Sequence, residues 1–288
     1  MKSFTLSIRL ILCLLITSII FPMYQTPAYA AATSEMNAPT GSENYILPDK
    51  PEKLAEPPSS TYIKQIDTCH VIIDLSGLDD IQYAVMIIQP KDEPIHFFCK
   101  QNDYLVFALT DGNGTYEIKL LYQVKGTLYK AFDHLTVTAK ASETSPYLDS
   151  TLSVHYDSEL QNLSTDICRQ ASSNLDKADA IQTFLSQVLE YDYDKAKNPE
   201  PKYRTDNETI LHAGCGICLD YATLMTAMLR SMNVPAKLIY GYPPNAGYHA
   251  WVEVWDGTHW VRYDPTWYDA LNGEYDPLAE NYVTTNWF

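Results

Sequence analysis

The amino-acid sequence predicts an α+β protein in which a small all-β unit precedes a mixed unit of helices and strands. Between residues 61 and 140, short runs rich in Val, Ile, Tyr and Phe alternate with turn sequences such as PKDEP and DGNG. After residue 145, apolar residues recur at helical spacing in two long segments, and strand-like runs then return. Helices followed by antiparallel strands are typical of the α+β class.

The first 30 residues have the features of a secretory signal peptide. Lys2 and Arg9 give a basic start, and residues 10–21 form an apolar run of 12, which is short for a membrane span. Ala28 and Ala30 supply the small residues of a cleavage site. We therefore expect a secreted, extracellular protein with no membrane attachment after cleavage.

The remaining chain is strongly acidic, and it begins with a Pro-rich linker at residues 31–60. The whole sequence has a net charge of −16, from 20 Lys and Arg against 36 Asp and Glu. Cleavage removes two cations and no acid, which leaves 18 against 36 and a net charge of −18. Such a surface repels nucleic acid and anionic lipid, so neither is expected as a partner.

Residues 61–140 are predicted to form a small antiparallel β-sandwich of the immunoglobulin or fibronectin type. The predicted strands are residues 69–76, 81–89, 95–100, 103–110, 115–124 and 128–139. His70, His96 and His134 show no metal-ligand spacing and are expected on the sheet surface. No metal site and no catalytic chemistry are predicted in this unit.

Residues 145–288 are predicted to form the mixed unit. An apolar stripe marks a helix that Asp176 could cap, formed by Ala178, Ile181, Phe184, Leu185, Val188 and Leu189. A second stripe, interpreted as core, contains Leu224, Met225, Met228, Leu229 and Met232. Strands are expected at residues 235–242, 248–255 and 259–267.

The dipeptide Asp256-Gly257 predicts a two-residue hairpin between the last two of these strands. In that register Trp255 pairs with Thr258, and His249 lies directly opposite Asp264. Directly paired residues have Cβ atoms about 5 Å apart, so an imidazole could contact a carboxylate there. A purely structural His–Asp pair is the alternative.

Cys218 lies in the segment GCGICLDYA, at the predicted start of the second helix. A helix N-terminus and a nearby imidazolium both lower the pKa of a thiol, which favours a nucleophilic Cys218 assisted by His249 and oriented by Asp264. Two alternatives remain for Cys215 and Cys218. They could form a thiol–disulfide exchange motif, although no clear strand precedes it, or they could contribute half of a metal site.

The motifs GICLDYATLMTAMLRSMNVPAKLIYGY and YHAWVEVWDGTHWVRYDPT resemble the transglutaminase-like superfamily over residues 176–266. The resemblance implies a papain-like catalytic domain with Cys218, His249 and Asp264 as the triad. It also implies attack on an amide bond through a Cys218 thioester, with peptide hydrolysis, deamidation or transglutamination as outcomes. We expect a protein or peptide substrate, with the cell surface as one location, and no cofactor.

Trp260, Trp267 and His212 are further candidates for substrate contact. Cysteine connectivity stays open: Cys69 and Cys99 could form a bridge, and Cys215 could pair with Cys168. Besides the enzyme, two classes of function stay open at this stage. One is a non-catalytic surface-binding module on the same fold, and the other is a thiol–disulfide oxidoreductase.

Overall fold

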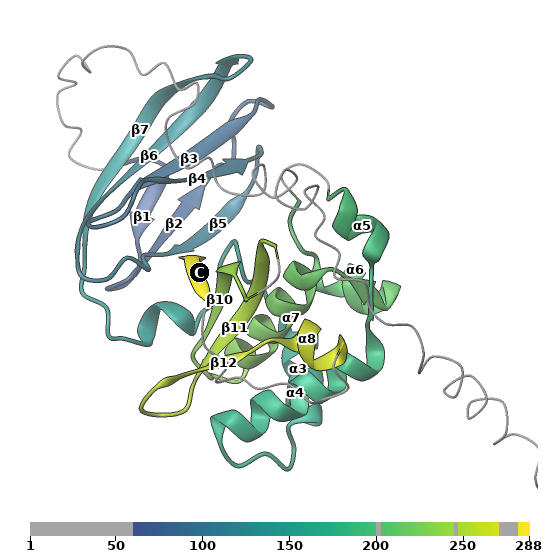
Figure 1. Cartoon of the computed structure of the whole chain (residues 1–288). Helices are drawn as coiled ribbons and strands as arrows, with labels where there is room; N and C mark the ends of the chain where they lie inside the picture. The colour runs from purple at the N-terminus through teal and green to yellow at the C-terminus, as the bar shows by residue number, and fades with distance from the viewer. Residues whose placement is uncertain (1–59, 200–202, 245–246, 271–281) are drawn as a thin grey trace, which may run out of the picture.

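A computed structural model describes residues 60–199, 203–244, 247–270 and 282–288 (Figure 1). The predicted signal peptide and all but the last residue of the predicted linker lie outside the described residues. None of the helices in the described ranges combines the length and the apolar character that crossing a bilayer requires.

The N-terminal unit consists of two antiparallel sheets. One has the strand order β1-β2-β5, with β1 at Ile63–Gln65, β2 at His70–Asp74 and β5 at Tyr104–Ala108. The other has the order β4-β3-β6-β7, from Ile95–Cys99, Tyr83–Ile88, Gly114–Lys125 and Leu128–Ala139. Both sheets appear in blue and teal in Figure 1.

Alternating side chains of these strands bury one shared core between the sheets. It includes Val71 and Ile73 of β2, Val85 of β3 and Ile118 of β6, each no more than 1% exposed. This arrangement follows from the period of two along a strand, which sends every second residue inward. The expected surface position of His70 and His96 is wrong, because both side chains are buried.

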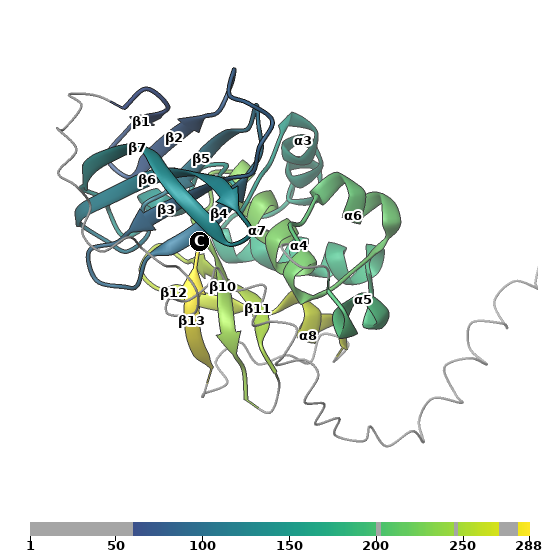
Figure 2. The ribbon, with the colours of Figure 1, turned by 90° about the horizontal axis from the view of Figure 1, so that it is seen from above.

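The C-terminal unit packs helices against a four-stranded antiparallel sheet of order β12-β11-β10-β13, which confirms the α+β class. The strands are Trp260–Tyr263, His249–Trp255, Ala236–Tyr242 and Val283–Trp287. The helices are α3 Ser158–Ile167, α4 Asn174–Val188, α5 Tyr193–Lys197, α6 Asn207–Ala213, α7 Cys218–Ser231 and α8 Pro265–Ala270. Figure 2 shows α7 among the other helices and next to the sheet.

Helix α7 is the centre of this unit, because every one of its residues is buried. A helix with no solvent-facing side must satisfy its polar side chains internally. Arg230 does so by donating to the backbone oxygens of Ala236, Asp149 and Phe288 at 2.9, 3.2 and 2.7 Å. The prediction that the methionine-rich stripe belongs to the core is confirmed for Met225 and Met228, because both side chains are fully buried.

Helix α4 starts three residues earlier than predicted from its sequence. Ser173, not Asp176, is the N-cap, and its hydroxyl accepts from the Asp176 N–H at 3.0 Å. Asp176 occupies the third helical position and returns a hydrogen bond by accepting from the Ser173 N–H at 2.9 Å. This reciprocal capping box satisfies two N–H groups that the helix cannot pair itself.

The hairpin between β11 and β12 has a four-residue loop, so the predicted register is wrong by two residues. Trp255 pairs with Trp260, not Thr258. The carboxylate of Asp256 accepts from the N–H groups of Thr258 and His259 at 2.6 and 2.7 Å, and these bonds close the wider loop. A shift of two keeps the same residues on each face of the ribbon, because side chains alternate with a period of two.

The two units are in direct contact. Phe288 packs against Phe97 of the N-terminal unit, and their ring centroids are 6.0 Å apart. The Trp287 indole N–H donates to the Thr110 carbonyl at 3.3 Å. The short 3-10 helix η1, Ser145–Tyr147, lies in the connection between the units.

The cysteines among the described residues form no disulfide. The suggested pairings of Cys69 with Cys99 and of Cys168 with Cys215 are therefore wrong for this structure. Cys69, Cys99 and Cys168 are buried, and Cys215 is partly exposed.

Candidate active site

His249 and Asp264 meet through a buried hydrogen bond between Nε2 and Oδ2 of 2.8 Å. His249 begins β11, and Asp264 follows the last residue of β12. In the observed register, one further pair would place Asp264 opposite Trp251, so His249 reaches it diagonally. The predicted contact between His249 and Asp264 is therefore present, although the register that predicted it is wrong.

The carboxylate of Asp264 is fully buried and held at both oxygens. While Oδ2 accepts from His249, Oδ1 accepts from the backbone N–H of Trp267 at 3.2 Å. The second contact caps the first turn of α8, where Pro265 occupies a position that needs no N–H acceptor. The start of a helix therefore fixes the orientation of the acid.

Cys218 is the first residue of α7, and it is 5% exposed. Burial alone would lower the pKa of His249, but the charges of Asp264 and Cys218 and hydrogen bonds to both raise it well above 6.5. Because Nε2 is bound to Asp264, Nδ1 is the ring atom left for the Cys218 sulfur. This electrostatic arrangement favours a thiolate–imidazolium pair at a helix N-terminus.

A buried network behind Cys218 was not recognised in the sequence. The Asp220 carboxylate, fully buried on α7, accepts from the Ile217 N–H at 2.9 Å and from Lys195 Nζ at 2.8 Å. It also accepts from the hydroxyls of Tyr203 and Thr205 at 2.7 and 3.0 Å. Asp220 could have been recognised in the sequence as an acidic capping residue at the third position of the helix. Lys195, Tyr203 and Thr205 could not, because they lie outside α7 and reach Asp220 only through the fold.

Two glycines shape the turn that presents Cys218. Gly214 ends α6 in the left-handed region, with a φ of 66° that an L side chain rarely adopts. Gly216 lies so close to Asp220 that an added Cβ would stand 2.7 Å from the Cβ of that residue. The glycines therefore allow the chain to pass close to the buried carboxylate before α7 begins.

Aromatic rings surround the His249 and Cys218 side chains. The ring centroid of Trp267 lies 6.2 Å from that of His249. The rings of Tyr240 and Tyr248 stack with their centroids 6.1 Å apart. Burial is the main cause that raises the pKa of both phenols, and the charge of Cys218 is a smaller cause that acts in the same direction. The tyrosines were missed because a tyrosine within a strand, like Tyr240, or just before one, like Tyr248, carries no distinctive sequence pattern.

The other two candidate contact residues lie elsewhere. Trp260 pairs with Trp255 at the hairpin end of the ribbon, about 20 Å from His249 along the strand. Its indole donates to Glu143 at 3.2 Å, and its ring packs against Tyr147. His212 is exposed in the last turn of α6.

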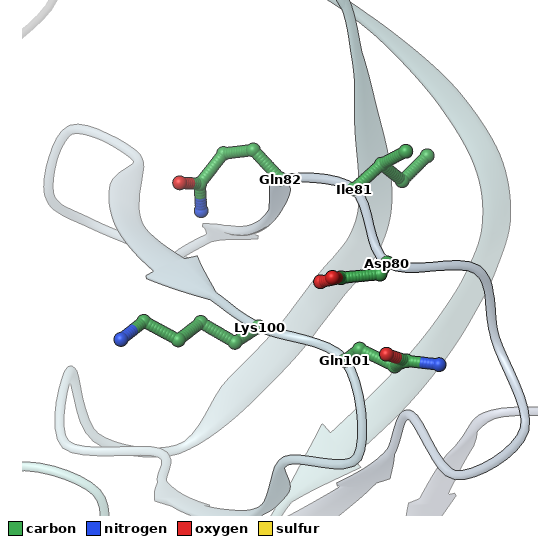
Figure 3. A pocket seen from close by; sticks show the side chains of 5 residues that line it. All are labelled: Asp80, Ile81, Gln82, Lys100 and Gln101. Carbon is green, nitrogen blue, oxygen red and sulfur yellow. The ribbon is translucent and has the colours of Figure 1, made fainter.

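A separate pocket lies in the N-terminal unit and contains none of these residues. Asp80, Ile81, Gln82, Lys100 and Gln101 line it, and Figure 3 shows Gln82 and Lys100 extending from neighbouring loop and strand ends. It holds no nucleophile with an adjacent base. We therefore place the candidate chemistry at Cys218 and His249.

Comparison with known proteins adds a family to this geometry. Residues 161–265 match the family described as the transglutaminase-like superfamily, which confirms the resemblance seen in the motifs. An uncharacterized protein of Mycobacterium leprae (strain TN) is 36% identical over 67 residues, covering 19% of this chain and 24% of that protein. Kyphoscoliosis peptidase of Mus musculus is 29% identical over 125 residues, covering 40% of this chain and 19% of that protein.

The chain thus spans about a quarter and about a fifth of these two relatives. Among solved structures, a proposed cysteine protease from Cytophaga hutchinsonii aligns with a TM-score of 0.42 and 16% identity. That alignment covers 76% of this chain and 80% of the other.

Proposed function

Residues 161–265 form a transglutaminase-like domain, and from that premise we propose that the chain is a secreted cysteine-dependent hydrolase of amide bonds in proteins or peptides. A domain of this family supports the general expectation of cysteine-dependent chemistry at amide bonds. The observation that carries the proposal is the buried 2.8 Å hydrogen bond between His249 and Asp264, with Cys218 interacting with the same imidazole. These are the parts of a nucleophile–base–orienting acid arrangement.

In the proposed reaction, the Cys218 thiolate attacks the amide carbonyl carbon and forms a tetrahedral intermediate. The C–N bond then breaks, and the His249 imidazolium gives its proton to the leaving amine. A Cys218 thioester remains, together with a neutral imidazole. Asp264 keeps its negative charge throughout and stabilises each imidazolium that forms.

Hydrolysis of the thioester completes the cycle. His249 removes a proton from water as the oxygen attacks the thioester carbon, and the C–S bond then breaks. The carboxylic acid product leaves, and the Cys218 thiolate and the His249 imidazolium are restored. The backbone N–H of Cys218 is a suitable donor to the oxyanion, because the first amides of a helix have no acceptor within the helix.

Water is favoured over an amine as the second substrate because of its concentration, about 55 M, and because no acceptor-amine site is evident among the described residues. The N-terminal apolar run at residues 10–21 supports secretion. A protein or peptide exposed outside the cell is the corresponding substrate class.

One experiment separates the possible reactions. The protein is incubated with a peptide library and a biotinylated amine, and the products are identified by mass. Hydrolysis yields shortened peptides, deamidation adds about 1 Da through Gln-to-Glu conversion, and transglutamination attaches biotin. Shortened peptides that disappear with Cys218→Ala are expected, whereas Cys215→Ala retains activity.

Deamidated or biotinylated products without cleavage would show that the protein catalyses deamidation or transglutamination instead of peptide hydrolysis. The absence of any product that depends on Cys218 would favour a binding module. Reduction of insulin disulfides that requires both Cys215 and Cys218 would favour an oxidoreductase instead.

A further inference from the structure

A second cluster of reactive side chains lies at the start of β2, in the N-terminal unit. Asp67, Cys69 and His70 place a carboxylate oxygen, a sulfur and a ring nitrogen within 4.8 Å of one another. Cys69 Sγ lies 3.4 Å from His70 Nδ1, and Asp67 Oδ2 lies 2.9 Å from the same nitrogen. We propose that these three residues bind a divalent transition metal ion of the Zn²⁺ class, beyond the function assigned to Cys218.

Metal–ligand bonds of about 2.0–2.3 Å at tetrahedral angles place neighbouring donors about 3.3–3.6 Å apart. The 3.4 Å distance between Cys69 Sγ and His70 Nδ1 lies in this range, and the 2.9 Å distance between Asp67 Oδ2 and the same nitrogen would have to widen slightly to admit the ion. Thiolate and imidazole donors select borderline or soft metals, whereas Ca²⁺ and Mg²⁺ require mainly oxygen. A set of one sulfur, one nitrogen and one oxygen therefore indicates Zn²⁺, with water in the fourth position.

The backbone already holds Asp67 in the orientation that a ligand needs. Its Oδ1 accepts from the N–H groups of Cys69 and His70, each at 2.7 Å. Oδ2 thereby faces the imidazole and is left to bind the ion. The turn from Asp67 to His70 thus holds the carboxylate beside the other two donors.

The other ring nitrogen of His70 provides an independent observation. Nε2 has no hydrogen-bond partner although the side chain is 1% exposed, and the nearest carboxylate oxygen is Asp149 Oδ2 at 3.6 Å. When a metal replaces the proton on Nδ1, the remaining proton lies on Nε2 and points at Asp149. Metal-binding histidines usually donate their second N–H to a carboxylate in this way, so the metal-bound tautomer would satisfy the buried atom.

The position of the cluster gives the ion a structural consequence. Ser145 Oγ lies 3.5 Å from Cys69 Sγ, and Ser145 and Asp149 both belong to the connection between the two units. Binding of the ion releases the thiol proton of Cys69 and the Nδ1 proton of His70 to water. The ion would then fix the start of β2 against the segment that leads into the catalytic unit.

The test uses the full chain with Cys218→Ala, so that the catalytic thiol does not compete for metal. Titration with Co²⁺ is expected to give one equivalent with a thiolate charge-transfer band and the intense visible bands of tetrahedral coordination, both displaced by Zn²⁺. Cys69→Ser is expected to remove the charge-transfer band. Cys168→Ser is the matched control, because that thiol is also buried but donates to the Lys177 carbonyl at 3.6 Å and is not part of the Asp67, Cys69 and His70 cluster.

Asp149→Asn is expected to weaken Zn²⁺ binding about 10- to 100-fold while the thiolate band persists. X-ray absorption of the Zn²⁺-loaded parent, which does not depend on folding of the variants, should show one sulfur among otherwise light ligands. A metal shell without sulfur, the absence of stoichiometric binding, or a charge-transfer band that survives in folded Cys69→Ser would overturn the proposal.

Discussion

Replacement of Asp264 by Asn is the substitution whose effect the structure defines best. Asn preserves the size of the side chain, and its amide oxygen can still accept from the Trp267 N–H at the Oδ1 position, now 3.2 Å away. The negative charge that faces His249 Nε2 at 2.8 Å is lost. Because this charge raises the pKa of His249, the imidazolium of the variant loses its proton at lower pH.

The size of the effect follows from the burial of the pair. Removing one partner of a buried ion pair costs about 3–5 kcal/mol, and each 1.36 kcal/mol is a factor of ten, so kcat/KM should fall about 10²- to 10⁴-fold. An isolated histidine would be neutral above a pH of about 6.5. In the wild type the raised pKa keeps His249 charged beyond that point, and the thiolate with it.

The assay is the rate of alkylation of Cys218 by iodoacetamide as a function of pH. The wild type should react fast at mildly acidic pH, well below the ordinary thiol pKa of about 8.5. In Asp264→Asn the midpoint should move upward towards that value. Asp179→Asn is the matched control, since Asp179 accepts from Tyr263 of β12 at 2.9 Å but does not contact His249. An unchanged midpoint in Asp264→Asn would refute the reasoning.

Two further substitutions test the supports of the site. Ser173→Ala should lower the free energy of unfolding by about 0.5–2 kcal/mol through loss of the α4 N-cap, measured by urea denaturation; an equal loss in Ser186→Ala, within the same helix, would contradict the capping role. Lys195→Met should leave the buried Asp220 carboxylate without its cation and cost about 3 kcal/mol of stability, with slower Cys218 alkylation. Lys197→Met, two residues further on but exposed, should change neither quantity, and a similar loss there would contradict the network account.

Local patterns sufficed for strands β2 to β7 and β10 to β12 and for the two apolar helices, α4 and α7. The period of two in the runs around Val85 and Ile118 predicted the sandwich strands, because burial between two sheets imposes that period. Short helices such as α6 escaped prediction, since a polar seven-residue segment has little helical periodicity. Strand β13 escaped too, because its stability comes from pairing with β10 across a long sequence separation.

The contact between His249 and Asp264 was predicted from a register that the structure does not have. Asp256-Gly257 indicated a two-residue turn, but the Asp256 side chain accepts from two later N–H groups and widens the loop. The predicted register was wrong by two residues, an even number, so His249 and Asp264 still lie on the same face of the hairpin. The network around Asp220 could not be predicted, because Lys195 and Tyr203 reach it through tertiary packing alone.

The activated thiol of Cys218 is tested most directly by a peptide vinyl sulfone and mapping of the modified residue by mass spectrometry. The account predicts a single adduct on Cys218 in the folded protein at mildly acidic pH, with no adduct on the more exposed Cys215 and strong slowing in His249→Ala. Preferential labelling of Cys215, or labelling of Cys218 at the same rate with and without the His249 imidazole, would contradict it.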